Sequence, residues 1–144
     1  MEADHLILLV EDDEDDAFLF QRALEQLGYT GRLQHVRKVE EAQTYLLGEK
    51  PFSGRREFPL PELIVADSAI EGATAAHLWE WIKNHQASQN IPFVVLSGDV
   101  SDLDRKRWRA QGVQWVFEKP GDPAEALSQM KSILQQAPSQ RSAD

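Results

Sequence analysis

Five short apolar runs alternate with segments of helical periodicity along this chain, and this alternation restricts its fold more than any other feature. Each run has the length of one strand, and apolar residues recur three and four positions apart in the segments between the runs. The runs cover residues 6–10, 33–37, 63–66, 91–96 and 113–117. Strand–helix units in series predict a parallel sheet, because parallel neighbours need helix-length connections.

Right-handed crossovers leave few topologies for five such units. The expected fold class is α/β: a flavodoxin-like, doubly wound, five-stranded parallel sheet in the order 2-1-3-4-5, with helices on both faces. Helices are expected at 18–27, 40–47, 75–85, 101–112 and 123–135, and a proline-containing loop at 50–61. One domain is expected over residues 1–137, followed by a polar tail at 138–144.

Composition excludes several classes of protein. The chain has no cysteine, so disulfide frameworks, cysteine metal sites and cysteine nucleophiles are excluded. No apolar run reaches the ~20 residues that cross a bilayer, and residues 1–5 lack the cationic start of a secretion signal. We therefore expect a soluble, cytoplasmic protein with no membrane partner.

The negative charge of the chain is concentrated near its start. Eight of the 24 acidic residues precede the first basic residue, Arg22, which leaves 16 acids against 15 bases in the rest of the chain. Six of the eight are consecutive, at 11–16. Nucleic acid is therefore not an expected partner, since it requires clustered lysine and arginine. A divalent cation is an expected one.

Polar residues follow four of the predicted strands at their carboxyl ends. Glu11 and Asp12 follow the first strand, Asp67 the third, Ser97 the fourth and Lys119 the fifth. These strands are neighbours in the expected order, so their end residues should share one mouth. The acidic turn after the first strand repels phosphate, which argues against a nucleotide or flavin site. Mg²⁺ fits, because it takes oxygen ligands from one or two carboxylates together with phosphate oxygens.

Bound Mg²⁺ would let Asp67 act as a nucleophile toward a phosphoryl group and form an acyl phosphate. Lys119 would neutralise the phosphoryl oxygens, and the Ser97 hydroxyl would donate a hydrogen bond to one of them. Phosphoryl transfer depends mostly on positioning and charge stabilisation, so these few side chains are sufficient for it.

Four segments at these strand ends resemble the signature segments of response-regulator receiver domains. They are Leu-Leu-Val-Glu-Asp-Asp at 8–13, Pro-Glu-Leu-Ile-Val-Ala-Asp at 61–67, Val-Val-Leu-Ser-Gly at 94–98 and Glu-Lys-Pro at 118–120. The resemblance spans about residues 6–134, nearly the whole chain. Nothing after Leu134 could form an output domain, so a stand-alone receiver is expected.

The resemblance implies a role for each strand-end residue. Glu11, Asp12, Asp67 and the carbonyl of Ala69 are implied as the Mg²⁺ ligands, Asp67 as the phosphoacceptor, Ser97 as the switch hydroxyl and Lys119 as the phosphate partner. It also implies that the bond between Lys119 and Pro120 is cis.

The function implied by the resemblance is that of a single-domain response regulator in two-component signalling. Such a protein accepts a phosphoryl group from a sensor histidine kinase and then changes its partner binding; it is not an enzyme beyond its own phosphorylation and slow self-dephosphorylation. The acidic opening at 10–20 and the stretched loop before the third strand resemble receivers that serve bacterial phytochrome kinases. The family also implies a homodimer through the fourth helix, fifth strand and fifth helix, whereas the sequence does not name a downstream partner.

Several residues depart from the family pattern. Val116 stands where the family has its aromatic switch residue, and Glu71 stands where it has a proline. Asp99, two residues after Ser97, lies where the family tunes the loss of phosphate. These departures keep open an alternative function, a pseudo-receiver that binds partners without phosphate.

A second alternative is a haloacid-dehalogenase-like phosphohydrolase. Its nucleophile belongs to an Asp-x-Asp motif after the first strand, which residues 13–15 offer, with Ser97 and Lys119 resembling its later motifs. Against this alternative, the chain has no cap insertion, and Asp67 would have no role. Aryl phosphate turnover that Asp13→Asn abolishes and Asp67→Asn preserves would favour the phosphohydrolase.

Overall fold

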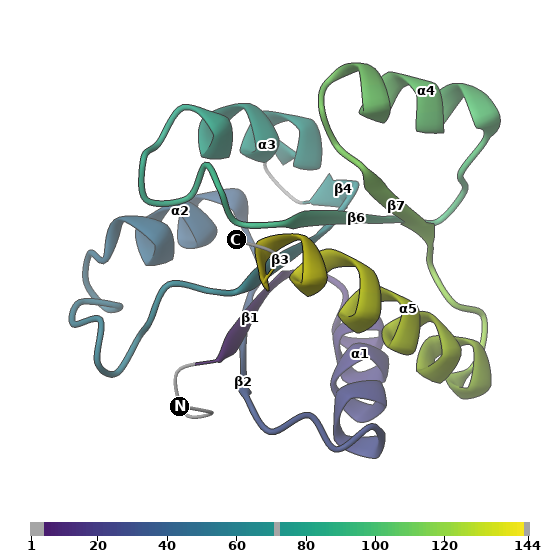
Figure 1. Cartoon of the computed structure of the whole chain (residues 1–144), viewed down its shortest axis with the longest axis horizontal. Helices are drawn as coiled ribbons and strands as arrows, with labels where there is room; N and C mark the ends of the chain where they lie inside the picture. Colours follow the sequence, from purple (N-terminus) through teal and green to yellow (C-terminus); the bar gives the residue numbers. More distant parts are fainter. Residues whose placement is uncertain (1–4, 71–72, 143–144) are drawn as a thin grey trace.

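The computed structural model describes residues 5–70 and 73–142 of the chain. The elements, in chain order, are β1 (Leu6–Val10), α1 (Glu14–Gln26), β2 (Arg32–Val36), α2 (Val39–Leu47), β3 (Leu63–Asp67), β4 (Ala69–Ile70), β5 (Ala73–Thr74), α3 (Ala75–Lys83), β6 (Phe93–Ser97), α4 (Asp102–Ala110), β7 (Trp115–Glu118) and α5 (Pro123–Ser142). Figure 1 shows these elements on the whole chain.

Five of the strands form one parallel sheet in the order β2-β1-β3-β6-β7. Numbered by their occurrence as long strands, these are 2-1-3-4-5, so the flavodoxin-like topology predicted from the sequence is confirmed. Strands β1 and β3, at the centre, are buried along their whole length. This burial explains why both read as continuous apolar runs, because a parallel sheet is covered on both faces.

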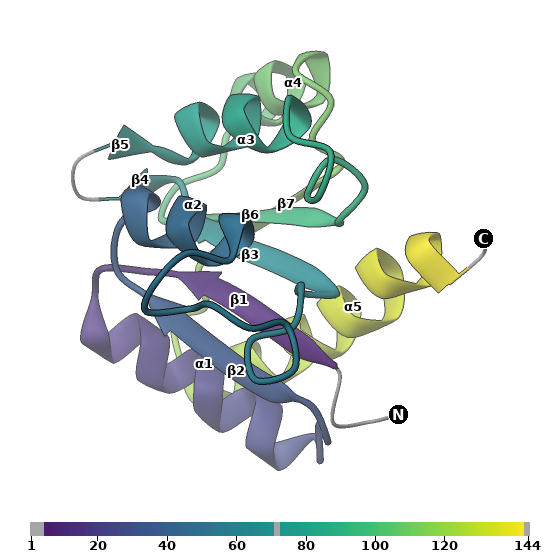
Figure 2. The same cartoon turned by 90° about the vertical axis from the view of Figure 1, so that its left-hand side faces the viewer.

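Helices cover the sheet on both faces (Figures 1 and 2). On one face, Leu6, Leu8 and Val10 of β1 pack with buried residues of α2 and α3. On the other face, Ile7 and Leu9 pack with buried residues of α1 and α5. Alternate residues of β1 thus serve two separate cores, as the two-residue period of a strand requires.

Helix α4 differs from the other helices in its packing. None of its nine residues, all of which the structure describes, is buried. The partly buried Trp108 joins it to the core that α2 and α3 share. A capping box fixes its start, because Ser101 accepts from the backbone N–H of Asp104 at 3.1 Å and Asp104 accepts from the backbone N–H of Ser101 at 3.0 Å.

The structure corrects several predicted element limits. β6 begins at Phe93, because Pro92 has no N–H to donate to a ladder. The short antiparallel pair β4–β5 beside Asp67 was not predicted, since two residues per strand are too few to show a period. Helix α5 continues past the expected end at Gln135 to Ser142, through Pro138.

None of the helices in the described part of the chain is both long and apolar enough to cross a lipid bilayer.

Candidate functional site

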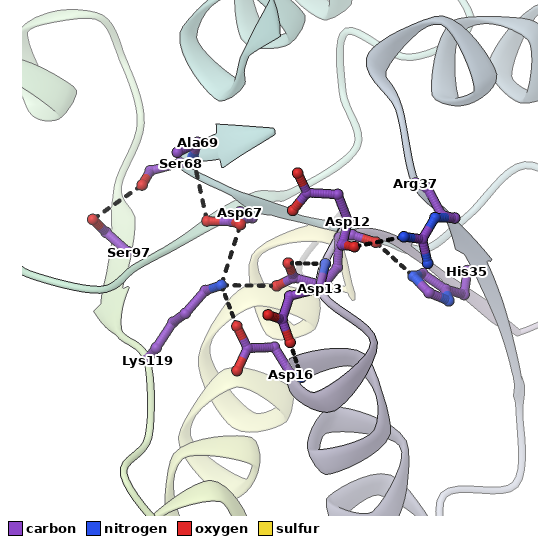
Figure 3. A network of polar contacts seen from close by, with 11 residues as sticks. Asp12, Asp13, Asp16, His35, Arg37, Asp67, Ser68, Ala69, Ser97 and Lys119 are labelled. Carbon is purple, nitrogen blue, oxygen red and sulfur yellow. Dashed lines mark hydrogen bonds and ion pairs between the residues drawn. The ribbon is translucent and has the colours of Figure 1, made fainter. Parts of the chain in front are cut away.

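The carboxyl ends of the parallel strands bring the predicted site residues together at one edge of the sheet (Figure 3). Asp67 is the last residue of β3 and pairs in register with Leu96, one residue before Ser97. Ser97 in turn is in register with Glu118, one residue before Lys119. Glu11 follows β1, and its backbone N–H continues the ladder by donating to Val36 at 2.9 Å.

Three carboxylates form the centre of the site. Glu11, Asp12 and Asp67 each present an oxygen, and these oxygens all lie within 4.8 Å of one another. Glu11 is 2% exposed and Asp67 is 7% exposed, so two of the three carboxylates are buried. Oxygen donors at this spacing suit a hard divalent cation, which would also relieve the repulsion between them.

The ammonium of Lys119 lies among the carboxylates and contacts three acids at once. Its Nζ lies 3.1 Å from Glu11 Oε1, 3.1 Å from Asp67 Oδ2 and 2.6 Å from Asp16 Oδ2. Burial by itself lowers the pKa of Lys119, but the hydrogen bonds to Asp16 and Glu11 and the charges of Glu11 and Asp67 hold that pKa above its ordinary value. Lys119 therefore remains a cation at any physiological pH.

Burial raises the pKa of Glu11 to about 7, from an ordinary value of 4.5. The backbone N–H of Asp13 donates to Glu11 Oε2 at 3.0 Å and opposes this shift, whereas the charge of Asp67 adds to it. Without a bound metal ion, the folded protein therefore holds Glu11 in its ionised form at a cost in free energy. This cost provides part of the physical reason for the site to bind a divalent ion.

A prediction for the metal-free protein follows from the raised pKa of Glu11. Between pH 4.5 and about 7 the folded chain keeps a proton on Glu11 that the unfolded chain has lost, so folding stability should fall as the pH rises through this window. Thermal unfolding in a chelator at several pH values measures the slope. Glu11→Gln should remove this part of the slope; an unchanged slope in that variant would contradict the assignment.

Two side chains of the β2 end hold the backbone of the acidic turn from outside. His35 Nε2 lies 2.7 Å from the carbonyl oxygen of Glu11, and Nε2 must donate because a carbonyl only accepts. Arg37 Nη2 donates to the carbonyl of Asp12 at 2.8 Å, and Arg37 Nη1 donates to Glu14 Oε1 at 2.7 Å. Figure 3 shows both residues on the side of the turn away from Lys119. They fix the turn without occupying its centre.

Two serines lie near the Asp67 carboxylate. Ser68 Oγ donates to Ser97 Oγ at 3.0 Å, and Ser97 Oγ donates to the carbonyl of Asp99 at 3.3 Å. The backbone N–H of Ala69 donates to Asp67 Oδ1 at 3.3 Å. Ser97 thus lies at the predicted edge of the sheet, and its hydroxyl accepts from Ser68 and donates to the carbonyl of Asp99.

The structure also corrects or limits some expectations. In the described ranges the cis peptide bond is Lys50–Pro51, and the bond between Lys119 and Pro120 is not cis. The preference of a proline amide for either isomer is small, so the isomer does not follow from motif resemblance. Val116, at the position of the family's aromatic switch, is buried at 7% exposure. Glu71 lies outside the described residues.

Four residues of the site were not assigned a role from the sequence. They are Asp16, His35, Arg37 and Ser68. Asp16 is close to the site because it lies one helical turn after Asp13, a spacing that the sequence does show. The contacts of His35, Arg37 and Ser68 depend on the path of the backbone at the ends of β2 and β3. No residue pattern in the sequence indicates this path.

Comparison with known proteins gives three findings. No protein-family profile matches the chain. The probable methanogenesis regulatory protein FilR2 of Methanothrix harundinacea (strain 6Ac) is 34% identical to it over 115 residues, which are 80% of this chain and 72% of that protein. Two other curated relatives, GltR of Pseudomonas aeruginosa and PhoB of Rhizobium meliloti, are transcriptional regulatory proteins that are each 24% identical to the chain, and the chain spans about half of their length.

Solved structures share the fold over most of the chain. The phosphorylated cyanobacterial phytochrome response regulator RcpA has a TM-score of 0.81 and 26% identity, and the match covers 94% of both chains. The bacteriophytochrome response regulator RtBRR has a TM-score of 0.77 and 26% identity, and the match covers 91% of this chain and 76% of that one.

Proposed function

We propose a function from the premise that this chain belongs to the family of response-regulator receiver domains. Its place in two-component signalling follows from that membership. The finer proposal is that Asp67 accepts a phosphoryl group from a sensor histidine kinase in a Mg²⁺-dependent reaction, and that phosphorylation changes which partner the chain binds. The observation that carries it is the buried Asp67 carboxylate, which shares Lys119 with Glu11 and lies within 4.8 Å of two other acids.

The transfer step is a displacement at phosphorus. An oxygen of the Asp67 carboxylate attacks the phosphorus atom of phosphohistidine, and the phosphorus–nitrogen bond breaks as the new phosphorus–oxygen bond forms. The imidazole leaves with the electron pair of the broken bond and takes up a proton. The product is an acyl phosphate on Asp67, and no oxidant or reductant is needed.

The chain's own side chains position and neutralise the group. Lys119, whose Nζ lies 3.1 Å from Asp67 Oδ2, would neutralise a phosphoryl oxygen attached there. The Ser97 hydroxyl would donate to another phosphoryl oxygen. Glu11, Asp12, Asp67 and the carbonyl of Ala69 would hold Mg²⁺, which when bound supplies positive charge to the phosphoryl oxygens.

The similar solved structures support the proposed partner. RcpA and RtBRR are named as phytochrome and bacteriophytochrome response regulators, so we propose a bacteriophytochrome histidine kinase as the donor. We also propose a homodimer through α4, β7 and α5, where Leu103 of α4 is 55% exposed. The transcriptional regulation that the names of longer relatives state is not carried over, because the chain matches only about half of their length.

The phosphohydrolase alternative has less support from the site. Asp13, its expected nucleophile, is the N-cap of α1 and accepts a hydrogen bond from the backbone N–H of Asp16 at 2.9 Å. Its side chain serves the helix start, and the residue is exposed. Asp67, in contrast, is buried against the Lys119 cation.

Acetyl phosphate, a small phosphoryl donor, tests the proposed function directly. With Mg²⁺ present we expect intact-mass measurement to show the addition of one phosphoryl group, because the acids can then tolerate the incoming negative charge. Addition of a chelator should reduce the modified fraction to background. An unmodified wild-type chain with Mg²⁺ present would contradict the proposal and favour the pseudo-receiver.

A further inference from the structure

A chain of two hydroxyls connects the acceptor strand to the loop before α4. Ser68, the residue after Asp67, donates from Oγ to Ser97 Oγ at 3.0 Å (Figure 3). Ser97 donates its own proton to the carbonyl oxygen of Asp99 at 3.3 Å. Three successive groups are thereby linked, and each serine acts as donor to the next group.

The proton count of this chain limits what Ser97 can do at rest. A serine hydroxyl has one proton, and the Ser97 proton is directed at the Asp99 carbonyl. Ser97 therefore cannot donate to a phosphoryl oxygen on Asp67 unless it releases Asp99. Its oxygen also accepts, and Ser68 can keep donating to it whichever way the Ser97 proton is directed.

We propose that Ser68 is a positioning residue for the switch hydroxyl of Ser97, an inference that rests on the proposed phosphorylation of Asp67. In the unmodified chain the Ser97 proton is held by the Asp99 carbonyl. When Asp67 carries a phosphoryl group, the Ser97 hydroxyl stops donating to the Asp99 carbonyl and donates to a phosphoryl oxygen instead. Ser68 continues to donate to Ser97 Oγ and holds it at the site.

The released Asp99 carbonyl lies in a short and lightly held segment. Val100 donates its backbone N–H to Glu118 Oε1 at 3.4 Å, and Ser101 is the N-cap of α4. Val100 also packs against the core, so loss of the bond to Asp99 frees the peptide group between Asp99 and Val100 and leaves the start of α4 held by its capping box. Val116 is a buried aliphatic residue without a ring to reorient, so the two serines provide the polar connection from β3 to this helix.

Four variants of the full chain test the inference: Ser68→Ala, Ser68→Thr, Ser97→Ala and the double alanine variant. The probe is beryllofluoride with Mg²⁺, which mimics a phosphoryl group on a carboxylate. The amide NMR shift of Val100 reports the fraction of switched loop at a saturating probe concentration, and a mass measurement of acetyl phosphate labelling reports the acceptor separately. Ser53→Ala, at an exposed loop serine, is the matched control.

Ser68→Ala should lower the ratio of switched to unswitched loop by up to about threefold, because Ser97 Oγ is no longer held at the site beforehand and must be fixed in one of three staggered rotamers when it binds the probe. Ser68→Thr, which keeps a hydroxyl, should restore the ratio, and Ser53→Ala should match the wild type. In the Ser97→Ala background, Ser68→Ala should have no further effect, because Ser68 acts through Ser97.

Two outcomes would overturn the role of Ser68 alone: a wild-type loop response in Ser68→Ala, or an additional loss when Ser68→Ala is combined with Ser97→Ala. Failure of Ser68→Thr to restore the response would also count against it, since the hydroxyl is the group proposed to act. A wild-type chain that neither binds beryllofluoride nor accepts phosphate would instead overturn the proposed function, and the role of Ser68 with it.

Discussion

Asp67→Asn should abolish both phosphorylation by acetyl phosphate and the response to beryllofluoride. The amide of asparagine has nearly the same shape as the carboxylate, but it lacks the anionic oxygen that attacks phosphorus. The fold should survive, because Lys119 retains Glu11 and Asp16 as partners at 3.1 Å and 2.6 Å. Intact mass gives the phosphorylated fraction, and thermal unfolding confirms that the variant is folded.

Asp13→Asn is the matched control for this experiment. Asp13 caps α1 through its side-chain oxygen, and asparagine caps a helix about as well as aspartate. Phosphorylation should therefore proceed in Asp13→Asn at close to the wild-type level. Retained modification in Asp67→Asn, together with loss in Asp13→Asn, would move the acceptor to the acidic turn and revive the phosphohydrolase.

Lys119→Met should cause the largest loss of stability that one substitution at this site can produce. The Lys119 side chain is 17% exposed and contacts Glu11, Asp67 and Asp16, two of which are buried. Removing one partner of a buried charge pair leaves an uncompensated charge, which typically costs about 3–5 kcal/mol. Denaturant unfolding of the metal-free protein at pH 8, where Glu11 is ionised, measures the change.

Added Mg²⁺ should stabilise Lys119→Met more than it stabilises the wild type, because a bound cation replaces the missing ammonium and binds only the folded state. Lys106→Met is the control, because Lys106 is exposed on α4, where a surface substitution typically changes stability by at most about 0.5 kcal/mol. Equal losses in the two lysine variants would show that the carboxylates do not depend on Lys119.

The sheet could be predicted from the sequence because burial on both faces makes each parallel strand a continuous apolar run. The five runs, with right-handed crossovers, leave the observed order as the leading one. Limits of elements were less predictable: the single residue Pro92 delays the start of β6, and α5 continues through Pro138 to Ser142, which no sequence pattern indicates. The β4–β5 pair is too short to have any periodicity.

The acids and the lysine of the site could be predicted because each directly follows a strand, and strand ends meet at one edge. Contacts made across elements could not. Arg37 reaches the carbonyl of Asp12 from β2, which depends on the register between β1 and β2 and on the rotamer of a long side chain. Ser68 follows Asp67 in sequence, but its hydroxyl is directed at Ser97 by the path of the chain after β3.

Helix α4 has a packing that bears on how a small chemical change could be transmitted. The helix has no buried residue; Trp108 packs against the core and Arg105 Nη1 donates to the Val116 carbonyl at 2.7 Å, so detachment exposes little apolar surface and local unfolding should cost less free energy than unfolding of the whole domain. Such an element can shift or fray while the sheet and the other helices stay intact. The same light anchoring implies fast amide hydrogen exchange in this helix. It also means that a single hydrogen bond near the start of α4 can change the fraction of molecules in which the helix is packed against the domain.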